Sequence, residues 1–332
     1  MIGIITAAIM WSCAALAQST SKVWRIGVFH VGVDHIPETL EGLRDGLRAL
    51  EYDVGSASMP RVSTVVTGSN VRLDWRNLEN EAAAREAAVE LVRDRADLIV
   101  AVEDQSLRGV QAATSDIPVV FLQIPDPVGE GFVKSLSKPG GNMTGFADFF
   151  IELVPKRLEL LNAIVPDLQR LLVLVDADDP ASRPLLEEVR RATDALKIEA
   201  MEVQARERED IERAFGSLNP GDVQAVFIAS ETLSTRFPTL VLRLATERKL
   251  AVPFHRRAWA MQGALFSYGP NYPALGRAAA VYVDKVLRGT KPADLPVQRA
   301  TQMELLINLK TARALGLTIP QSLLVSADEV IE

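Results

Sequence analysis

The sequence predicts an α/β protein of two doubly wound lobes, each built on a mostly parallel sheet, with a hinge between them. The chain has 332 residues, which is long for one hydrophobic core, so two lobes are expected. Apolar segments alternate with segments of helical periodicity through two successive halves, as in strand–helix units joined by right-handed crossovers. In residues 117–145 an apolar strand runs into an acidic, proline-flanked loop and then into Gly140-Gly141-Asn142. Open α/β sheets place ligands after such strands, so we expect this stretch to line a cleft and to begin the hinge.

The first half of the chain reads as successive strand–helix units. Within residues 37–50, four leucines share one helical face while charged residues lie off it, which predicts a helix. The other elements expected here are strands at 23–31, 71–75, 97–102 and 117–124, and helices at 79–95, 107–114 and 128–136.

Residues 56–68 read as an insertion in this half. They are rich in Ser, Thr, Val and Gly and lack helical periodicity. We expect a surface excursion, with a hairpin around Pro60 and Gly68, that makes no ligand contacts.

The second half repeats the pattern and is followed by a tail. Its expected helices are 152–165, 181–196, 209–218 and 236–248, and its expected strands are 170–175, 199–203, 225–229 and 252–254. The tail predicts a helix at 272–288, a turn at Lys291-Pro292, a strand at 304–307 and a short helix at 309–315.

The N-terminus resembles an export signal. Residues 2–16 are almost entirely apolar and carry no charge, and Ala15-Leu16-Ala17 fits a small-x-small cleavage site. We expect residues 1–17 to be a signal peptide, which gives a mature start at Gln18 and a periplasmic location. Acylation of Cys13 is an alternative, although Met10-Trp11-Ser12 is a poor lead-in for it; a buried N-terminal strand or helix is another. Cys13 is the only cysteine, so cleavage would leave a mature chain without thiol chemistry.

Composition and motif searches exclude several functions. The net charge of −7 and the lack of a Lys/Arg tract argue against a nucleic-acid partner. No nucleotide-binding glycine loop, zinc-protease motif or nucleophile elbow is present. His30, His35 and His255 are the only histidines, and none is spaced to share a metal with another. No enzyme activity, cofactor or metal is therefore expected.

Several segments together resemble a known family. They are DPVGEGFVKSLSKPGGNMTGF at 126–146, KRLELL at 156–161, SYGPNY at 267–272, AAVYVDKVLRGTKPADLPV at 281–297 and ELLINLKTARALGLTIPQSLLVSADEVIE at 304–332. They resemble substrate-binding proteins of an ABC transporter family related to the tryptophan-transporter binding protein, which have the type I periplasmic-binding fold.

The resemblance implies a function and a domain organisation. It implies capture of a small solute outside the cytoplasm, delivery to a cognate ABC permease in the inner membrane, and two lobes with three crossovers that close on the ligand by hinge bending. Residues 23–145 with about 270–300 would form the first lobe, and residues 146–269 with about 301–332 the second. We expect a monomer.

Three departures from the family pattern fall at strand ends. Glu-Asp-Gln stands at 103–105 where the family tends to have Gly-Thr-Pro. Asp-Ala-Asp-Asp-Pro stands at 176–180 in place of Asn-Pro-Ala-Asn-Pro, and Arg-Ala-Trp at 257–259 in place of Arg-Glu-Phe. Because such positions face the cleft, the family's aromatic or branched amino-acid ligand is only a weak guide here.

The strand ends supply candidate ligand contacts. The candidate hydroxyl donors are Ser106, Thr144 and Ser230, and the candidate acidic partners for an ammonium group are Glu103, Asp104, Asp126, Asp176, Asp178 and Glu231. The candidate apolar contacts are Phe29, Phe149, Phe150, Trp259 and Tyr268. His30 and Gln105 are further candidate ligand contacts. Arg257 sits where the family pattern has its arginine, and we expect it to meet a ligand carboxylate or to brace the closed form. Structural roles compete, because a strand-end aspartate such as Asp178 is often a helix cap, and Trp259 or Tyr268 can pack between lobes.

The excess of acidic candidates indicates the charge of the ligand. Unpaired carboxylates in a closed, dry cleft would be unfavourable, so we expect an amine-bearing solute such as an amino acid rather than a sugar or a dicarboxylate. A periplasmic enzyme or a ligand-sensing module on the same fold is the alternative. The enzyme lacks a nucleophile–base pair, and the sensor lacks a DNA-binding helix-turn-helix before the first strand.

Overall fold

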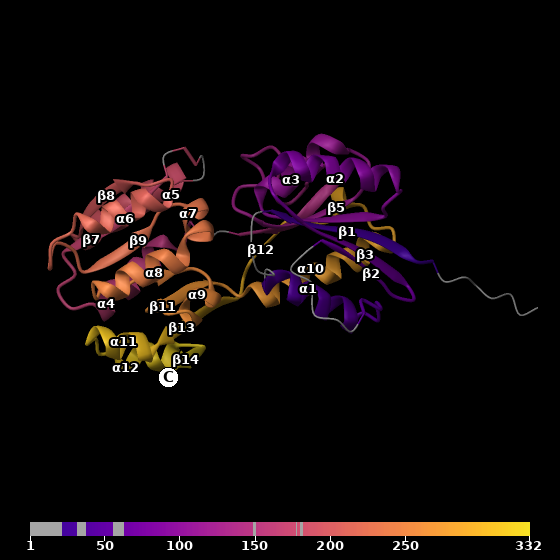
Figure 1. Ribbon diagram of the computed structural model, residues 1–332. Coiled ribbons are helices and arrows are strands. Elements are labelled where there is room, and N and C mark those ends of the chain that lie inside the picture. The colour runs from indigo at the N-terminus through magenta and orange to yellow at the C-terminus, as the bar shows by residue number, and fades with distance from the viewer. Residues whose placement is uncertain (1–21, 32–37, 56–62, 149–150, 177, 180–181) are drawn as a thin grey trace, which may run out of the picture.

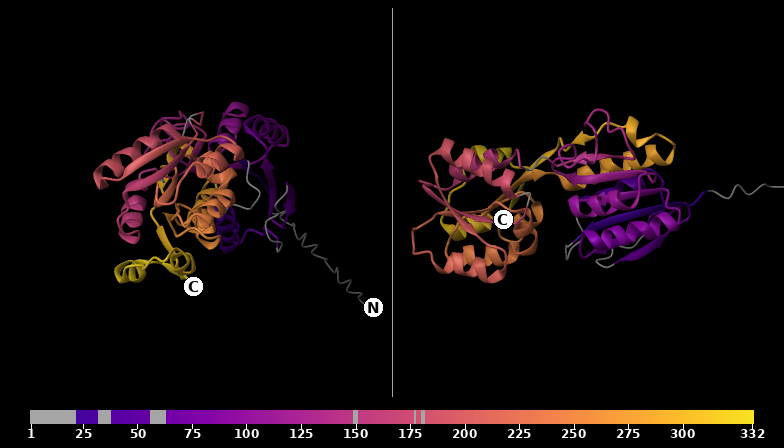
Figure 2. Two further views of the ribbon diagram at one scale, coloured as in Figure 1. Left: turned by 60° about the vertical axis from the view of Figure 1, so that its left-hand side comes forward. Right: turned by 90° about the horizontal axis from the view of Figure 1, so that it is seen from above.

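The structure, a computed structural model, describes residues 22–31, 38–55, 63–148, 151–176, 178–179 and 182–332. Two lobes stand side by side and are joined by thin connections (Figures 1 and 2). The predicted signal peptide, Cys13 and Phe149 lie outside the described residues.

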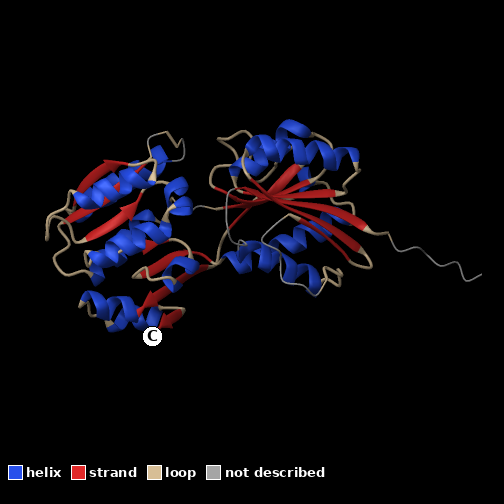
Figure 3. Cartoon of the chain, in the orientation of Figure 1, coloured by secondary structure: helices blue, strands red, loops and turns tan. Residues whose placement is uncertain are grey.

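Lobe one is built on a sheet of seven strands in the described residues. Their order is β12 (Gln298–Arg299), β6 (Met143–Ala147), β5 (Val119–Ile124), β4 (Leu98–Val102), β1 (Trp24–Val31), β3 (Val71–Leu78) and β2 (Thr64–Thr67). All neighbouring pairs are parallel except β2 with β3. Helices α1 (Glu38–Ala49) and α10 (Tyr272–Leu287) pack on one face of the sheet, and α2 (Glu81–Arg93) and α3 (Asp104–Ala113) on the other (Figure 3). The apolar strands are buried on both faces, as expected for a parallel sheet.

Lobe two holds two smaller sheets. The first is β8 (Glu199–Gln204), β7 (Arg170–Val175) and β9 (Ala225–Ile228); the second is β10 (Pro253–Phe254), β11 (Phe266–Pro270), β13 (Met303–Asn308) and β14 (Glu329–Ile331). A parallel bridge between Ala225 and Ala251 links them. The helices are α4 (Val154–Ile164), α5 (Ser182–Leu196), α6 (Arg208–Gly216), α7 (Glu231–Arg236), α8 (Pro238–Glu247), α9 (Arg257–Met261), α11 (Leu309–Leu315) and α12 (Gln321–Ser326).

Along the described elements, the chain changes from one group of sheets to the other at three places. It leaves lobe one after β6, returns at Asn271 between β11 and α10, and leaves again between β12 and β13. Gly140-Gly141-Asn142 therefore does not begin the hinge, because it leads into β6 of lobe one, and lobe one extends past residue 145. The Asn142 amide donates to the Ile117 carbonyl oxygen (2.8 Å) and holds this loop on the sheet.

Two other sequence expectations were wrong in detail. Residues 128–136 form consecutive turns rather than a helix; the Asp126 carboxylate accepts from the Gly129 amide (2.8 Å), and Gly131 has a left-handed φ of 76°. The helix expected at 236–248 corresponds to α8, which starts at Pro238 because proline has no amide to donate, but the helix before it, α7 at 231–236, was not expected.

The tail and the insertion also differ from expectation. The elements α9, β11, α12 and β14 were not predicted. In the predicted insertion, residues 56–62 lie outside the described part, but β2 is an edge strand paired with β3. That part of the insertion therefore belongs to the sheet.

Helices α1 and α10 pack closely through glycines, which yields a stability prediction. A Cβ at Gly276 would lie 1.8 Å from the Thr39 carbonyl oxygen and 2.5 Å from the Leu43 amide nitrogen, both backbone atoms. Gly276→Ala must push the helices apart, and we expect it to lower the free energy of unfolding by about 1–3 kcal/mol in urea denaturation. Gly216→Ala is the control, because nothing lies within 4 Å of its Cβ. Equal stabilities of the two variants would contradict this packing.

Candidate ligand-binding site

A cavity of about 340 Å³ lies between the lobes and is lined by residues of both. Lobe one contributes residues at the carboxyl ends of its strands, namely His30 and Val31 of β1, Glu79 after β3, Val102, Glu103 and Gln105 at and after β4, and Gln123 of β5. Lobe two contributes Glu231, Thr232, Thr235 and Arg236 of α7 together with Arg256 and Trp259. The carboxyl ends of parallel strands are where open α/β sheets bind ligands.

A larger cavity, of about 600 Å³, lies within lobe two. Its walls include residues 165–166, 218–224 and 247–251, which precede β7, β9 and β10. It therefore sits at the amino ends of these strands, opposite the edge where such folds bind ligands. The smaller cavity, with charged groups converging from two lobes, is the better candidate.

The lobe-one wall holds two unusual backbone conformations. Glu103 has φ 66° and ψ 168°, a region that is essentially reserved for glycine. Gln123 has φ 60°, at the point where the register of β5 against β6 shifts. Among the described residues, the other non-glycine positive-φ positions all follow helix ends: Glu51, Arg95, Asp167, Lys197 and Lys249. Only Glu103 and Gln123 hold such conformations at strand ends, and both line the cavity.

Polar atoms on this wall are buried without partners. Glu103 Oε1, Asp104 Oδ1 and Gln123 Nε2 have no hydrogen-bond partner within the described part of the chain. Burial raises the pKa of Glu103 to about 8, although hydrogen bonds from Ser106 act in the opposite direction and lower that pKa. Burial also raises the pKa of Asp104 to about 6, although Arg108 opposes it. Unpartnered buried groups are unfavourable, so they indicate a site for a ligand.

The lobe-two wall is organised around Arg256. Its Nη2 donates to Glu231 Oε1 (2.9 Å), and its Nε donates to His255 Nε2 (3.1 Å). His255 must accept that bond as a neutral imidazole, and burial does lower its pKa. Burial opposes ionisation of Glu231, yet the paired guanidinium holds the pKa of that carboxyl below its usual range. This wall therefore carries an ion pair that is already satisfied.

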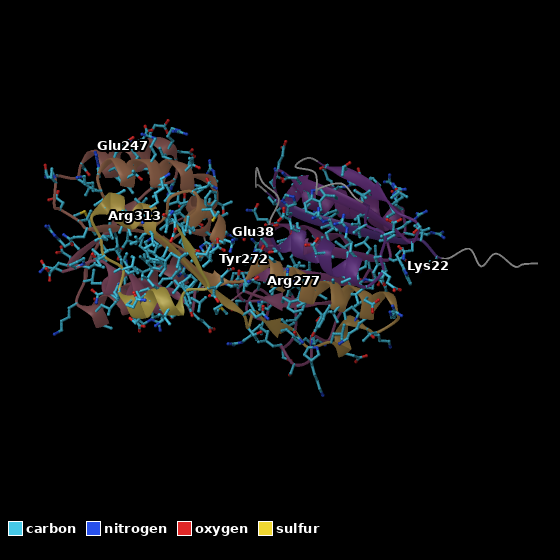
Figure 4. The ribbon with its side chains drawn as sticks, turned by 90° about the horizontal axis from the view of Figure 1, so that it is seen from below. Lys22, Glu38, Glu247, Tyr272, Arg277 and Arg313 are labelled. Carbon is cyan, nitrogen blue, oxygen red and sulfur yellow. The ribbon has the colours of Figure 1, made fainter. Side chains whose placement is uncertain are left out.

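The same arginine connects lobe two to the crossings. Its guanidinium lies 4.8 Å from the ring centroid of Tyr272, at the start of α10 in lobe one. The Tyr272 hydroxyl donates to Asp148 Oδ2 (2.7 Å), just after β6. Figure 4 shows Tyr272 where the two lobes meet. Two of the three crossings are thus adjacent to the cavity.

Comparisons with known proteins agree with this architecture. A family model described as ABC transporter substrate binding protein matches residues 28–331. This chain belongs to that family. A tyrosine-binding protein of Clostridioides difficile is 28% identical over 251 residues, which cover 75% of this chain and 72% of that protein.

Solved structures give the same result. A conserved domain protein from Vibrio cholerae has a TM-score of 0.79 and 27% identity, over 93% of this chain and 100% of that one. An ABC domain in complex with L-Trp from Streptococcus pneumonia has a TM-score of 0.78 and 27% identity, with the same coverage. The predicted family and the two-lobed type I periplasmic-binding fold are therefore confirmed.

In this substrate-binding protein, the cavity brings together only part of the predicted site. His30, Glu103, Gln105, Glu231 and Trp259 line it. Asp104 does not, although its charge interacts with that of Glu231 across the cleft.

The remaining predicted residues have structural roles elsewhere. Three hydroxyls are used within the protein: Ser106 donates to the Val102 carbonyl, Thr144 donates to the Leu295 carbonyl (2.6 Å), and Ser230 caps α7. The three carboxylates have local partners: Asp126 caps a turn, Asp176 accepts from the Asp178 amide (3.0 Å), and Asp178 pairs with Arg206 (2.7 Å). Of the aromatic residues, Tyr268 packs on the lobe-two core and Phe29 is fully buried. Hydrogen bonding within the protein already engages the hydroxyls of Ser106, Thr144 and Ser230, which the sequence assigned to a ligand.

Arg257 is a specific correction. It begins α9 and pairs with Glu304 of β13 (2.7 Å) and Glu329 of β14 (2.6 Å), so it braces lobe two rather than facing the cavity. The neighbouring Arg256 faces the cavity instead. Sequence reasoning also missed Glu79, Gln123, Thr232, Thr235 and Arg236. The signal for Gln123 was present, as a lone polar residue in the apolar run 117–124.

Neither membrane nor metal features appear in the described residues. No helix there is long and apolar enough to cross a bilayer. No group of three His, Cys, Asp or Glu side chains there could hold a metal ion.

The perturbed carboxyl of Glu103 makes stability depend on pH. Its pKa is about 8 in the folded chain against an ordinary 4.5, so the folded protein retains a proton that the unfolded chain has lost between these values. The contribution of Glu103 to the free energy of unfolding of the wild type therefore falls as pH rises from about 4.5 to about 8. Because glutamine does not titrate, Glu103→Gln should be more stable than wild type, by a margin that grows from pH 5 to pH 8 in urea denaturation.

The matched control is Glu86→Gln, an exposed carboxyl on α2. We expect no pH-dependent difference from wild type for that variant. A Glu103→Gln advantage that is absent, or equal at pH 5 and pH 8, would show that the Glu103 carboxyl is well solvated.

Proposed function

We propose that this protein is the extracytoplasmic solute receptor of an ABC importer, which binds a small amine-bearing solute, such as an amino acid, between its lobes. The observation that carries the proposal is the cavity itself, with Glu103, whose Oε1 has no hydrogen-bond partner, on one wall and the Arg256–Glu231 pair on the other. An ammonium group at Glu103 would supply the missing partner and keep the carboxyl ionised. Two similar proteins are named for tyrosine or hold L-Trp, which are both amine-bearing.

Closure of the lobes completes the mechanism. The three crossings are the candidate hinge, and rotation about them would bring α7 of lobe two toward the strand ends of lobe one. Closure removes water from the ligand, which strengthens its polar contacts. The closed monomer would then be recognised by a cognate permease in the inner membrane.

A calorimetric titration tests the ligand charge. We expect wild type to bind an amine-bearing solute from an amino-acid panel, and Glu103→Gln with Asp104→Asn to bind it at least tenfold more weakly, about 1.4 kcal/mol. Asp126→Asn is the control, because Asp126 lies in an exposed turn outside the cavity. Equal affinity of the double variant and wild type, or binding of amine-free anions alone, would reject an amine-bearing ligand.

Export is a separate prediction. The apolar leader that ends in Ala15-Leu16-Ala17 should be removed when the full chain is expressed in a Gram-negative host. Mass spectrometry of the periplasmic fraction should show a mature start near Gln18. Intact Met1 on soluble cytoplasmic protein would contradict export, and a lipid-modified Cys13 would show anchoring instead.

A further inference from the structure

Most of the residues that line the cavity have polar side chains. Of the thirteen described residues that line it, only Val31, Val102 and Trp259 are apolar. The Trp259 side chain is 6% exposed and packs near Phe254 in the lobe-two core, with 6.0 Å between ring centroids. An aromatic ligand side chain gains its affinity by burying a large apolar ring against apolar walls. Here carboxyl, amide and hydroxyl groups also line the walls and can select a ligand through polar contacts.

The charges in the cavity do not balance. Arg256 pairs with Glu231 (2.9 Å), and Arg236 is 3.5 Å from Glu207. Within the described part of the chain, neither Glu79 nor Glu103 has a cation at ion-pair distance. Once the internal pairs are removed, two carboxyls of lobe one remain without a cation: the exposed Glu79, and Glu103, whose raised pKa keeps it protonated at neutral pH until a cation approaches.

The order of the strands in the lobe-one sheet sets the separation between the backbone positions of Glu79 and Glu103. Glu103 follows β4 and Glu79 follows β3, and β1 lies between these strands. Neighbouring strands are about 4.8 Å apart, so the two strand ends are separated by roughly 10 Å. An aliphatic chain with an amine at each end has a length of the same order as this backbone separation.

The backbone at Glu103 gives independent support. Its φ and ψ suit glycine, so the side chain strains the local structure, and its Oε1 is buried without a partner. Glycine would relieve both problems. A strained backbone and a buried carboxyl oxygen without a partner, both at the cavity wall, indicate a role in binding.

We infer that the solute carries two amine groups, as a diamine or a basic amino acid does, and that Glu79 and Glu103 each bind one of them. This inference rests on the proposed function and narrows it. In a basic amino acid, the carboxylate would face Arg256 and the hydroxyls of Thr232 and Thr235 on lobe two. A diamine lacks that group and would leave this wall to water.

A binding panel tests the inference on the purified full mature chain. The probes are putrescine, cadaverine, L-lysine and L-ornithine, compared with L-tryptophan, L-tyrosine, L-leucine and succinate, by thermal shift and then calorimetry. We expect a two-amine probe to bind at least tenfold more tightly than every single-amine probe. Preference for L-lysine or L-ornithine assigns a basic amino acid, and preference for putrescine or cadaverine assigns a diamine.

Variants then locate the two amines. Glu79→Gln and Glu103→Gln should each weaken the two-amine probe tenfold or more, while Glu86→Gln, an exposed carboxyl on the same lobe, should not. Glu103→Gly should lose binding yet raise the melting temperature, a gain that a merely structural Glu103 would not give. Melting curves confirm that each variant is folded.

The outcomes separate the two proposals. Tighter binding of L-tryptophan, L-tyrosine or L-leucine than of every two-amine probe overturns the inference and leaves the amine-binding function standing. Binding of succinate without any amine overturns both. Failure of every two-amine probe to bind folded protein, or unchanged affinity in both glutamine variants, also overturns the inference.

Discussion

Arg256 is a half-buried charge that is paired, and contacts on both sides of the interlobe cavity depend on that pairing. An unpaired guanidinium in this environment would be strongly unfavourable, so Glu231 and the neutral His255 are held against it. Tyr272 presents its ring to the same guanidinium, and its hydroxyl binds Asp148. Since Tyr272 and Asp148 flank two crossings of the chain, pairing of one arginine ties the lobe-two wall to the connections between the lobes.

The lobe-one wall follows the opposite principle. Glu103 has a glycine-type backbone, an unpartnered carboxyl oxygen and a raised pKa. Each of these features reduces stability, and together they concentrate at the strand ends where ligands bind in this fold. One wall is therefore internally satisfied, and the other is left incomplete until a ligand arrives.

Membership of the family determines the fold of this protein but leaves the identity of its ligand open. Proteins that share this architecture include one named for tyrosine and one that holds L-Trp. The ligand depends on the residues at the strand ends, and here Glu79, Glu103 and Gln123 place carboxyl and amide groups at the cavity. A shared fold is thus compatible with a different solute.

The sequence by itself determined the succession of elements, because hydrophobic periodicity is local. The segments 170–175 and 309–315 match β7 and α11 residue for residue, and the two-lobed α/β class follows from their alternation. Glu103, Gln105 and Glu231 were identified because they follow strands. Local pattern could not show that Arg256 rather than Arg257 faces the cavity, since that depends on pairing of Arg257 with Glu304 and Glu329.

Tertiary structure also decided where the chain crosses between the lobes, the pairing of β2 and the backbone of Glu103. These features depend on sheet order and on contacts between segments far apart in the chain. The turn at 128–136 was misread because its helical propensity gave way to glycine and Asp126 hydrogen bonding. Strand-end position can therefore be inferred from sequence, whereas side-chain direction requires the packed structure, because partners from other elements determine which polar groups are already satisfied.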